Sequence, residues 1–182
     1  MGPGTDQDGH LTLSQRIAVL VLVPLAVIFV GVISTFYVNY STAYVDGDSM
    51  EPTLTSGELV LVSRGYDQPL RGDVVVVSRE NGDGSSDVLV KRIVALSGDE
   101  VQVDEGNATI NGRAEQGRHT VFIAPCDLSV PLQVVPDDEV FLLGDNRPIS
   151  EDSRLFGTVP LSDVRGKVIA VIRPLSSARF VD

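Results

Sequence analysis

The longest apolar stretch of this chain lies near its N-terminus, at residues 17–38. None of these residues is charged and nearly all are apolar (IAVLVLVPLAVIFVGVISTFYV). As a helix they would span roughly 33 Å at ~1.5 Å per residue, which is enough to cross a bilayer. Tyr37 and Tyr40 suit the aromatic belt at a membrane interface. The sequence therefore predicts a transmembrane anchor at residues 17–38, after a disordered polar tail at residues 1–16.

A cleaved signal peptide is the competing interpretation of the same stretch. Ser41 and Ala43 make a passable small-x-small cleavage site, but the run is longer than the ~7–15 apolar residues of a typical signal peptide. We therefore expect an anchor, with cleavage near Ala43 left open. Arg16 precedes the run and no lysine or arginine follows until Arg64. This charge asymmetry favours a cytoplasmic N-terminus, with residues 43–182 on the outer side of the cell membrane.

Beyond residue 43 the chain consists of short β-like runs separated by glycine, proline and aspartate. Residues 74–77 are four consecutive valines, which is typical of a strand buried on both faces. We expect residues 79–87 to form a solvated connection, and 105–107 and 111–112 to form tight turns. The other expected strands are 58–62, 89–96, 101–103, 108–110, 120–123, 132–135, 140–143 and 167–172. The sequence thus predicts an all-β domain at residues 43–182 on one N-terminal helix.

The composition excludes several classes of function. A net charge of −11 argues against nucleic acid as a partner, because a phosphate backbone attracts basic patches. The single cysteine, Cys126, excludes an intramolecular disulfide and Cys-rich metal sites, and we expect it to be a small apolar filler. No metal or cofactor motif is present, so neither is expected.

Residues 47–54 (GDSMEPTL) place one small hydroxyl between Gly47 and Pro52, which both interrupt helices and strands. Ser49 is therefore expected in an irregular, exposed turn, where its hydroxyl can act as a nucleophile. The alternative is an ordinary loop, because Asp-Ser and Pro-Thr steps are common in turns.

Lys91 lies in an apolar strand, on the same face as Ile93, whereas Arg92 lies on the other face. One of the two cations is therefore expected to point into apolar surroundings. Burial disfavours the charged amine, and lowering a lysine pKa from ~10.4 by two to three units gives a usable general base. The alternative is that both cations reach solvent or pair with carboxylates.

Residues 144–157 (GDNRPISEDSRLFG) follow an apolar strand and combine acids, bases and hydroxyls. Their charged side chains can hold a long turn together by charge-assisted hydrogen bonds. Ser150 could hydrogen-bond an amine and orient it, which is the third role that a nucleophile and its base usually require. A Ser-His-Asp triad would need His119, which lies in a polar stretch and is not favoured.

Four blocks of this sequence resemble the type I signal peptidases, membrane-anchored serine proteases that remove signal peptides from exported proteins. The blocks are residues 47–54, 71–76 (RGDVVV), 90–99 (VKRIVALSGD) and 144–154, and they follow an apolar helix where the family has its anchor. The resemblance covers most of residues 15–175. It implies a β-rich core of antiparallel sheets.

The resemblance also implies a role for each matching residue. Ser49 would be the nucleophile and Lys91 the general base, with Ser150 hydrogen-bonded to the lysine amine. The residues expected to support the site through ion pairs are Asp145, Arg92, Asp152 and Arg154. Lysine at position 91 resembles the bacterial form of the family.

One position departs from part of the family. Some relatives carry, two positions before the nucleophile, a serine whose hydroxyl assists the oxyanion, and here that position is Gly47. This resembles the Gram-positive-like variants. It leaves the Ser49 backbone N–H and an unidentified second donor to stabilise the oxyanion.

The resemblance therefore implies an endopeptidase that cleaves exported preproteins after a small-x-small motif, with preproteins and the bilayer as its partners. Two alternatives remain open. One is another Ser-Lys protease with the same core, such as a self-cleaving repressor, against which the apolar helix argues. The other is a non-catalytic membrane-anchored β-module, which the joint presence of Ser49, Lys91 and Ser150 does not favour.

Overall fold

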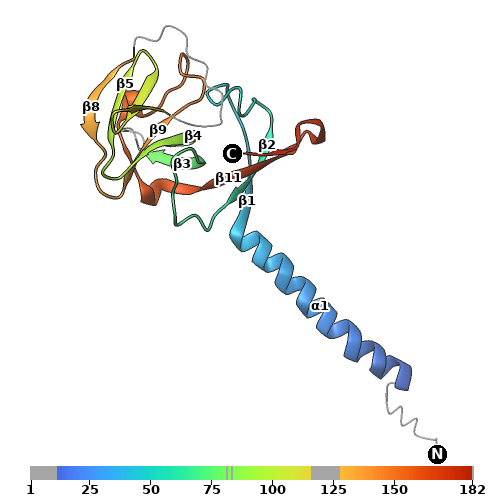
Figure 1. Ribbon diagram of the computed structural model, residues 1–182. Coiled ribbons are helices and arrows are strands. Elements are labelled where there is room, and N and C mark those ends of the chain that lie inside the picture. Colours follow the sequence, from blue (N-terminus) through green and yellow to red (C-terminus); the bar gives the residue numbers. More distant parts are fainter. Residues whose placement is uncertain (1–11, 81, 83, 116–127, 182) are drawn as a thin grey trace, which may run out of the picture. The chain divides into compact units, whose positions relative to one another are not determined.

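The computed structural model describes residues 12–80, 82, 84–115 and 128–181. The chain divides into two compact units, residues 1–38 and residues 39–182. The first unit contains a single long helix in its described part, and the second is rich in β-strands (Figure 1).

Helix α1 (Leu13–Asn39) has 27 residues and is long and apolar enough to cross a membrane. It begins earlier than expected, because Thr12 and Gln15 form a capping box. The Thr12 N–H donates to Gln15 Oε1 (2.8 Å) and the Gln15 N–H donates to Thr12 Oγ1 (3.4 Å). The prediction of a disordered tail is therefore wrong for residues 13–16, while residues 1–11 lie outside the described residues. None of the helix's side chains is buried within the protein.

Two antiparallel sheets form the second unit in the part of the chain that the structure describes. The larger has eight strands in the order β1-β2-β11-β3-β4-β9-β10, with β12 pairing β11. Its strands are β1 (Tyr40–Tyr44), β2 (Leu59–Ser63), β3 (Val74–Glu80), β4 (Ser86–Leu96), β9 (Glu139–Leu143), β10 (Val159–Pro160), β11 (Val164–Arg173) and β12 (Arg179–Phe180). The predicted class, an all-β domain of antiparallel sheets with one N-terminal helix, is confirmed.

The smaller sheet has four strands in the order β7-β6-β5-β8. These are β5 (Glu100–Asp104), β6 (Asn107–Ile110), β7 (Arg113–Ala114) and β8 (Val130–Val134). The expected turns at 105–107 and 111–112 connect β5 to β6 and β6 to β7. Three short helices complete the described part, namely α2 (Ser153–Phe156), η1 (Leu161–Asp163) and η2 (Leu175–Ser177).

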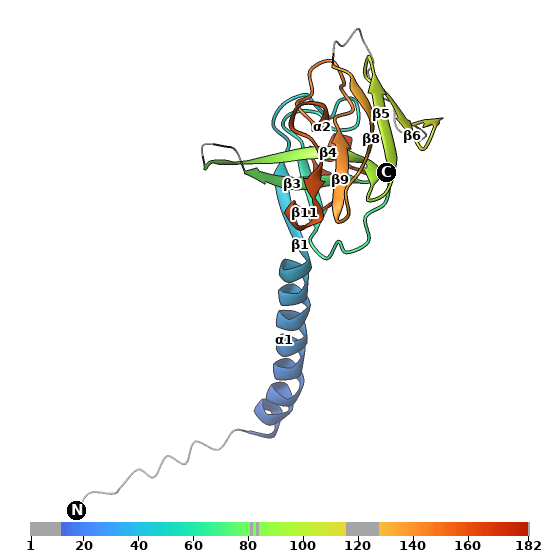
Figure 2. The ribbon, with the colours of Figure 1, turned by 90° about the vertical axis from the view of Figure 1, so that its left-hand side faces the viewer.

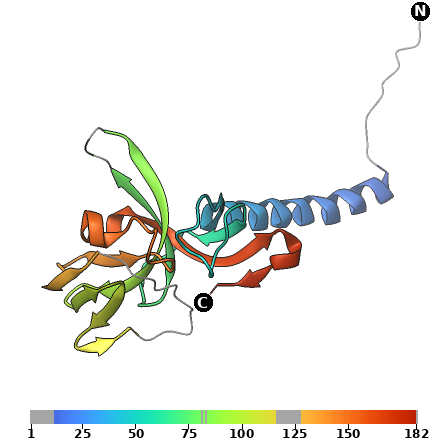
Figure 3. The same cartoon turned by 90° about the horizontal axis from the view of Figure 1, so that it is seen from above.

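One domain boundary and one expected connection need correction, and one expected strand falls outside the described residues. The domain begins at Tyr40 rather than residue 43, because β1 pairs with β2 along its whole length. The hairpin of β3 and β4 remains paired as far as Glu80 and Ser86, so residues 79–87 are not simply a solvated connection. Figures 2 and 3 show this hairpin extending away from the other strands. The strand expected at 120–123 lies outside the described residues.

Strand β3 lies between two parts of the core, as its four valines predict. Val74 and Val76 belong to a cluster with β2 and β11, whereas Val75 and Val77 belong to a cluster with β9. All four are buried. A third cluster joins β4 and β9 to the smaller sheet. Strand β4, which carries Lys91, is therefore held firmly from Arg92 to Ala95, where every side chain is buried.

Gly166 lies where β11 passes very close to β2. A Cβ at this position would lie 2.2 Å from the carbonyl oxygen of Ser63. We expect Gly166→Ala to lower the free energy of unfolding by about 2–3 kcal/mol, because one of the two strands must shift to relieve the clash. Denaturant unfolding of the full chain in detergent measures this change.

The matched control is Gly65→Ala, because a Cβ at position 65 meets nothing nearer than 3.9 Å. It should unfold at nearly the wild-type denaturant concentration. Equal stability of the Gly166→Ala and wild-type proteins would contradict the close approach of β11 to β2.

Candidate active site

Ser49 lies in the turn that connects β1 to β2, as expected, although it is half-buried rather than exposed. Its neighbours hold the turn in place, because Met50 and Leu54 are buried in the core. The Leu54 N–H donates to the carbonyl oxygen of Met50 (2.9 Å), and the Glu51 N–H donates to that of Asp48 (3.1 Å). The hydroxyl of Ser49 is thus presented from a turn whose backbone is anchored on both sides.

Gly47 has a φ of 89°, a backbone conformation that glycine adopts freely and other residues rarely do. A serine at this position would be strained. The turn as it stands therefore favours glycine over serine two positions before Ser49.

Lys91 points from β4 towards this turn, and its Nζ lies 2.8 Å from Ser49 Oγ. Nζ also donates to the carbonyl oxygen of Val90 at 3.1 Å. Lys91 is 3% exposed, and this burial lowers the pKa of its amine, while the negative charges of Asp152 and Glu151 oppose the shift. The structure thus brings together the predicted nucleophile and the predicted base, with the amine in surroundings that favour its neutral form.

Arg92, on the opposite face of β4, is also buried. Both neighbouring cations are therefore removed from solvent, whereas only one was expected to be. Its guanidinium forms a bidentate ion pair with Asp145, with Nε–Oδ1 at 2.8 Å and Nη2–Oδ2 at 2.7 Å. Arg92 also donates to the carbonyl oxygen of Gly72 and to Thr53 Oγ1, and the Thr53 hydroxyl donates to Asp145. This pair therefore links the turn that carries the predicted nucleophile Ser49 (residues 47–54, the nucleophile turn) to the start of β3, to β4 and to the end of β9.

Asp152 and Arg154 form a second buried ion pair, with Arg154 Nε at 2.8 Å from Asp152 Oδ1. Asp152 caps α2 and also accepts from the Gly144 N–H at 3.0 Å. Arg154 donates to the carbonyl oxygens of Arg147 (2.7 Å) and Ser150 (3.2 Å). The pair closes the loop at residues 144–152 and sets the position of Ser150.

Ser150 is buried beside the site, but the expected hydrogen bond to Lys91 is not formed. Its Oγ has no hydrogen-bond partner among the described residues, and Lys91 Nζ donates to Ser49 Oγ and Val90 O. A Cβ on Gly144 would lie 2.2 Å from Ser150 Oγ and 2.5 Å from the carbonyl oxygen of Ser49. The hydroxyl is therefore next to the nucleophile turn, and only a glycine at position 144 leaves room for both.

Asn146 is a residue that the sequence analysis did not single out. Its N–H donates to the carbonyl oxygen of Ser49 (3.0 Å), and its Nδ2 donates to that of Asp48 (3.1 Å). Asn146 thus fastens the loop after β9 to the nucleophile turn. Its only signal in the sequence is its place in the fourth matching block, beside Asp145.

Arg179 was also missed as a supporting residue, whereas Arg147 is one of the charged residues expected to hold the turn at 144–157 together. Arg179 of β12 donates to the carbonyl oxygen of Thr53 (2.5 Å) and to both carboxylate oxygens of Glu58. Arg147 is fully buried and donates to the carbonyl oxygen of Gly144 at 2.9 Å. No local pattern predicts the Arg179 contacts, because they join segments that meet only in the folded chain. The Arg147 contact with Gly144 spans three residues and agrees with the expectation that the charged side chains of residues 144–157 hold that turn together.

The described residues contain no group of three or more histidine, cysteine, aspartate or glutamate side chains placed to hold a metal ion. His119 and Cys126 lie outside the described residues.

A buried amine within hydrogen-bond distance of a serine hydroxyl is the arrangement of a serine peptidase that uses lysine as its base. The chain belongs to the signal peptidase family, peptidase S26, whose family model matches residues 16–173. The family predicted from the four sequence blocks is therefore confirmed.

Individual relatives agree with this family. The chain is 35% identical over 153 residues to signal peptidase I of Bacillus amyloliquefaciens, covering 75% of this chain and 74% of that protein. It is 33% identical over 138 residues to probable signal peptidase I-2 of Synechocystis sp., covering 72% of this chain and 62%, less than two thirds, of that protein. Among solved structures, signal peptidase I from Enterococcus faecalis is similar with a TM-score of 0.42 and 26% identity, covering 57% of this chain and 98% of that one.

The buried Arg92–Asp145 pair predicts a large loss of stability when one partner is removed. We expect Arg92→Met to lower the free energy of unfolding by about 3–5 kcal/mol, because the Asp145 carboxylate is left buried and uncompensated. Arg71→Met is the control, since the Arg71 side chain is 49% exposed in its pair with Asp99. That substitution should cost about 1 kcal/mol or less. If denaturant unfolding shows the same loss of unfolding free energy in both variants, the buried pair contributes no more to stability than the exposed one, and the prediction is wrong.

Proposed function

We propose that this chain is a membrane-anchored serine endopeptidase that cleaves signal peptides from exported preproteins after a small-x-small motif. The observation that carries this proposal is the 2.8 Å contact between Lys91 Nζ and Ser49 Oγ, made by an amine whose pKa is lowered by burial. Membership of the signal peptidase family supports the choice of substrate.

In the proposed mechanism, neutral Lys91 takes the proton of Ser49 as Oγ attacks the carbonyl carbon of the scissile bond. The resulting ammonium gives this proton to the departing amine, which leaves an acyl-enzyme on Ser49. The Lys91 amine, neutral again, then activates a water molecule, which hydrolyses the acyl-enzyme and releases the signal peptide. The Ser49 N–H makes no hydrogen bond within the described residues, so it is available to the oxyanion, where one donor can contribute ~3–4 kcal/mol.

Ser150 is the base-orienting residue in this proposal. An ammonium group has three donors, and Ser49 Oγ and Val90 O accept two of those of Lys91. The unpaired hydroxyl of Ser150 could accept the third when the amine becomes charged. The two ion pairs, Arg92–Asp145 and Asp152–Arg154, support the site by fixing the turn and the loop that carry the reacting groups.

The substrate is proposed to bind as an added strand beside β4. Residues 86–91 pair with β3 on one side, whereas pairing with β9 begins only at Arg92. The other edge of this segment is therefore open next to Lys91, and an extended peptide could pair with it through its backbone. Small residues at the first and third positions before the scissile bond would enter shallow apolar pockets.

The proposed role of α1 is to hold the enzyme in the cell membrane, with the N-terminus in the cytoplasm and the β-domain outside. The helix exposes apolar side chains all around, which suits a hydrocarbon environment. Confining enzyme and substrate to one membrane plane raises their effective concentration.

Cleavage of a preprotein with a small-x-small site by the detergent-solubilised full chain tests the proposal. Ser49→Ala and Lys91→Ala should each lower the cleavage rate by at least about 1000-fold, because each removes a reacting group. Arg165→Ala, which removes an exposed cation on β11, should leave the rate unchanged. Substantial cleavage by either of the first two variants would refute a Ser49–Lys91 mechanism.

The pH dependence of the rate tests the state of Lys91. The active form is the neutral amine, so the rate should fall as the pH drops through its lowered pKa. Glu151 is exposed and its negative charge raises this pKa, so Glu151→Gln should move the acid limb of the profile to lower pH. A rate that stays flat from about pH 9 to about pH 5 is incompatible with a lysine base.

A further inference from the structure

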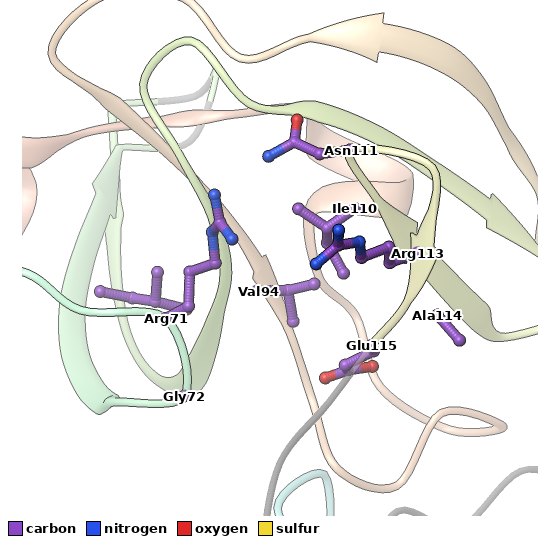
Figure 4. A pocket seen from close by; sticks show the side chains of 9 residues that line it. Arg71, Gly72, Val94, Ile110, Asn111, Arg113, Ala114 and Glu115 are labelled. Atoms are coloured by element: carbon purple, nitrogen blue, oxygen red, sulfur yellow. The ribbon is translucent and has the colours of Figure 1, made fainter.

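A pocket of about 360 Å³ lies between the larger sheet and the β6–β7 hairpin, and neither Ser49 nor Lys91 is among its lining residues. Its walls come from the turn before β3, from β4, and from residues 110–115 (Figure 4). The volume is at the lower end of the range for small-molecule sites, ~300–1,000 Å³.

Two arginines from opposite walls face this pocket. Arg71 comes from the turn before β3 and Arg113 from β7, and Figure 4 shows both side chains beside the same space. The Arg71 guanidinium is paired through Nε and Nη2 with Asp99. Arg113 makes no ion pair or hydrogen bond in the described part of the chain, although the protein has 25 acidic residues against 14 basic ones. Among the described residues, no carboxylate pairs with this guanidinium of the pocket.

The other polar groups of the pocket are already engaged. Asn111 donates through Nδ2 to Asp99 (3.0 Å) and accepts through Oδ1 from the Glu100 N–H (2.9 Å). The Glu115 carboxylate is paired with the buried Arg147, with Nη2–Oε2 at 2.6 Å. Of the charged side chains that line the pocket, Arg113 is thus the one with no partner among the described residues.

The rest of the lining is apolar, since Ile93, Val94 and Ile110 are buried core residues that form part of the wall. An anion held here would be partly removed from water, where attraction to a guanidinium is stronger than at an open surface. Guanidinium groups match carboxylates through paired, parallel hydrogen bonds. The apolar wall would accommodate a short aliphatic stem behind the charged group.

We propose that this pocket binds a carboxylate on a short aliphatic stem, between Arg113 and Arg71. Such a group is carried both by acidic side chains of peptides and by free dicarboxylates. The proposal does not depend on the peptidase mechanism, because none of these residues belongs to the Ser49–Lys91 site.

Isothermal titration calorimetry of the full chain in neutral detergent tests it with two probes. One is glutarate and the other is a capped Leu-Glu-Leu tripeptide, with the corresponding Leu-Gln-Leu tripeptide as the uncharged control; neither tripeptide carries the small-x-small motif proposed for the Ser49–Lys91 site. We expect saturable binding of at least one acidic probe and none of the control. Tighter binding of the tripeptide would indicate a peptide side chain as the source, and tighter binding of glutarate a free dicarboxylate.

Two variants locate the binding. Arg113→Gln should weaken binding at least tenfold, and its thermal unfolding should match that of the wild type, because Arg113 is exposed and pairs with none of the described residues. Arg165→Gln, an exposed arginine outside the pocket, should bind as the wild type does. The proposal is overturned if neither acidic probe binds at about 10 mM, or if Arg113→Gln binds them as tightly as the wild type.

Discussion

The candidate site depends on the ion pair between Arg92 and Asp145, which is almost fully removed from solvent. Burying two charges is costly unless their remaining hydrogen-bonding groups are satisfied. Here Thr53 and the carbonyl oxygen of Gly72 supply further hydrogen bonds to the pair. The pair is therefore fully bonded only when the four segments that carry Thr53, Gly72, Arg92 and Asp145 have come together. The position of the nucleophile turn relative to β4 is a consequence of this requirement, and so is the short distance between Ser49 and Lys91.

The alternation of side chains along β4 gives two neighbouring cations different chemistry. Arg92 faces a carboxylate, whereas the nearest hydrogen-bond acceptors of Lys91 are the neutral oxygens of Ser49 and Val90. Without a carboxylate in direct contact, burial of the Lys91 amine lowers its pKa. One strand thereby provides a fixed charge that holds the fold together and, one residue earlier, an amine that can give up its proton.

The sequence was sufficient to predict the parts that local pattern controls. The four valines of β3 alternate between two clusters as a doubly buried strand must, and Ser49 lies in a turn between Gly47 and Pro52. Strand β1 (Tyr40–Tyr44, YSTAY) was missed because it has no apolar alternation and exists through pairing with β2. The contact of Arg179 with the nucleophile turn could not be foreseen, because it joins positions 126 residues apart. The hydrogen bond expected for Ser150 depends on side-chain orientation, which residue spacing does not determine.

The order of the contributing residues along the chain has a consequence for the newly made protein. Ser49 emerges first, its partner Lys91 is 42 residues away, and Asn146 and Arg179, which fasten its turn, come later still. Until the later segments have been synthesised, the serine carries an ordinary peptide hydroxyl with no amine beside it. Ser49 and Lys91 therefore reach hydrogen-bond distance, in a turn held from both sides, only when the β-domain is complete.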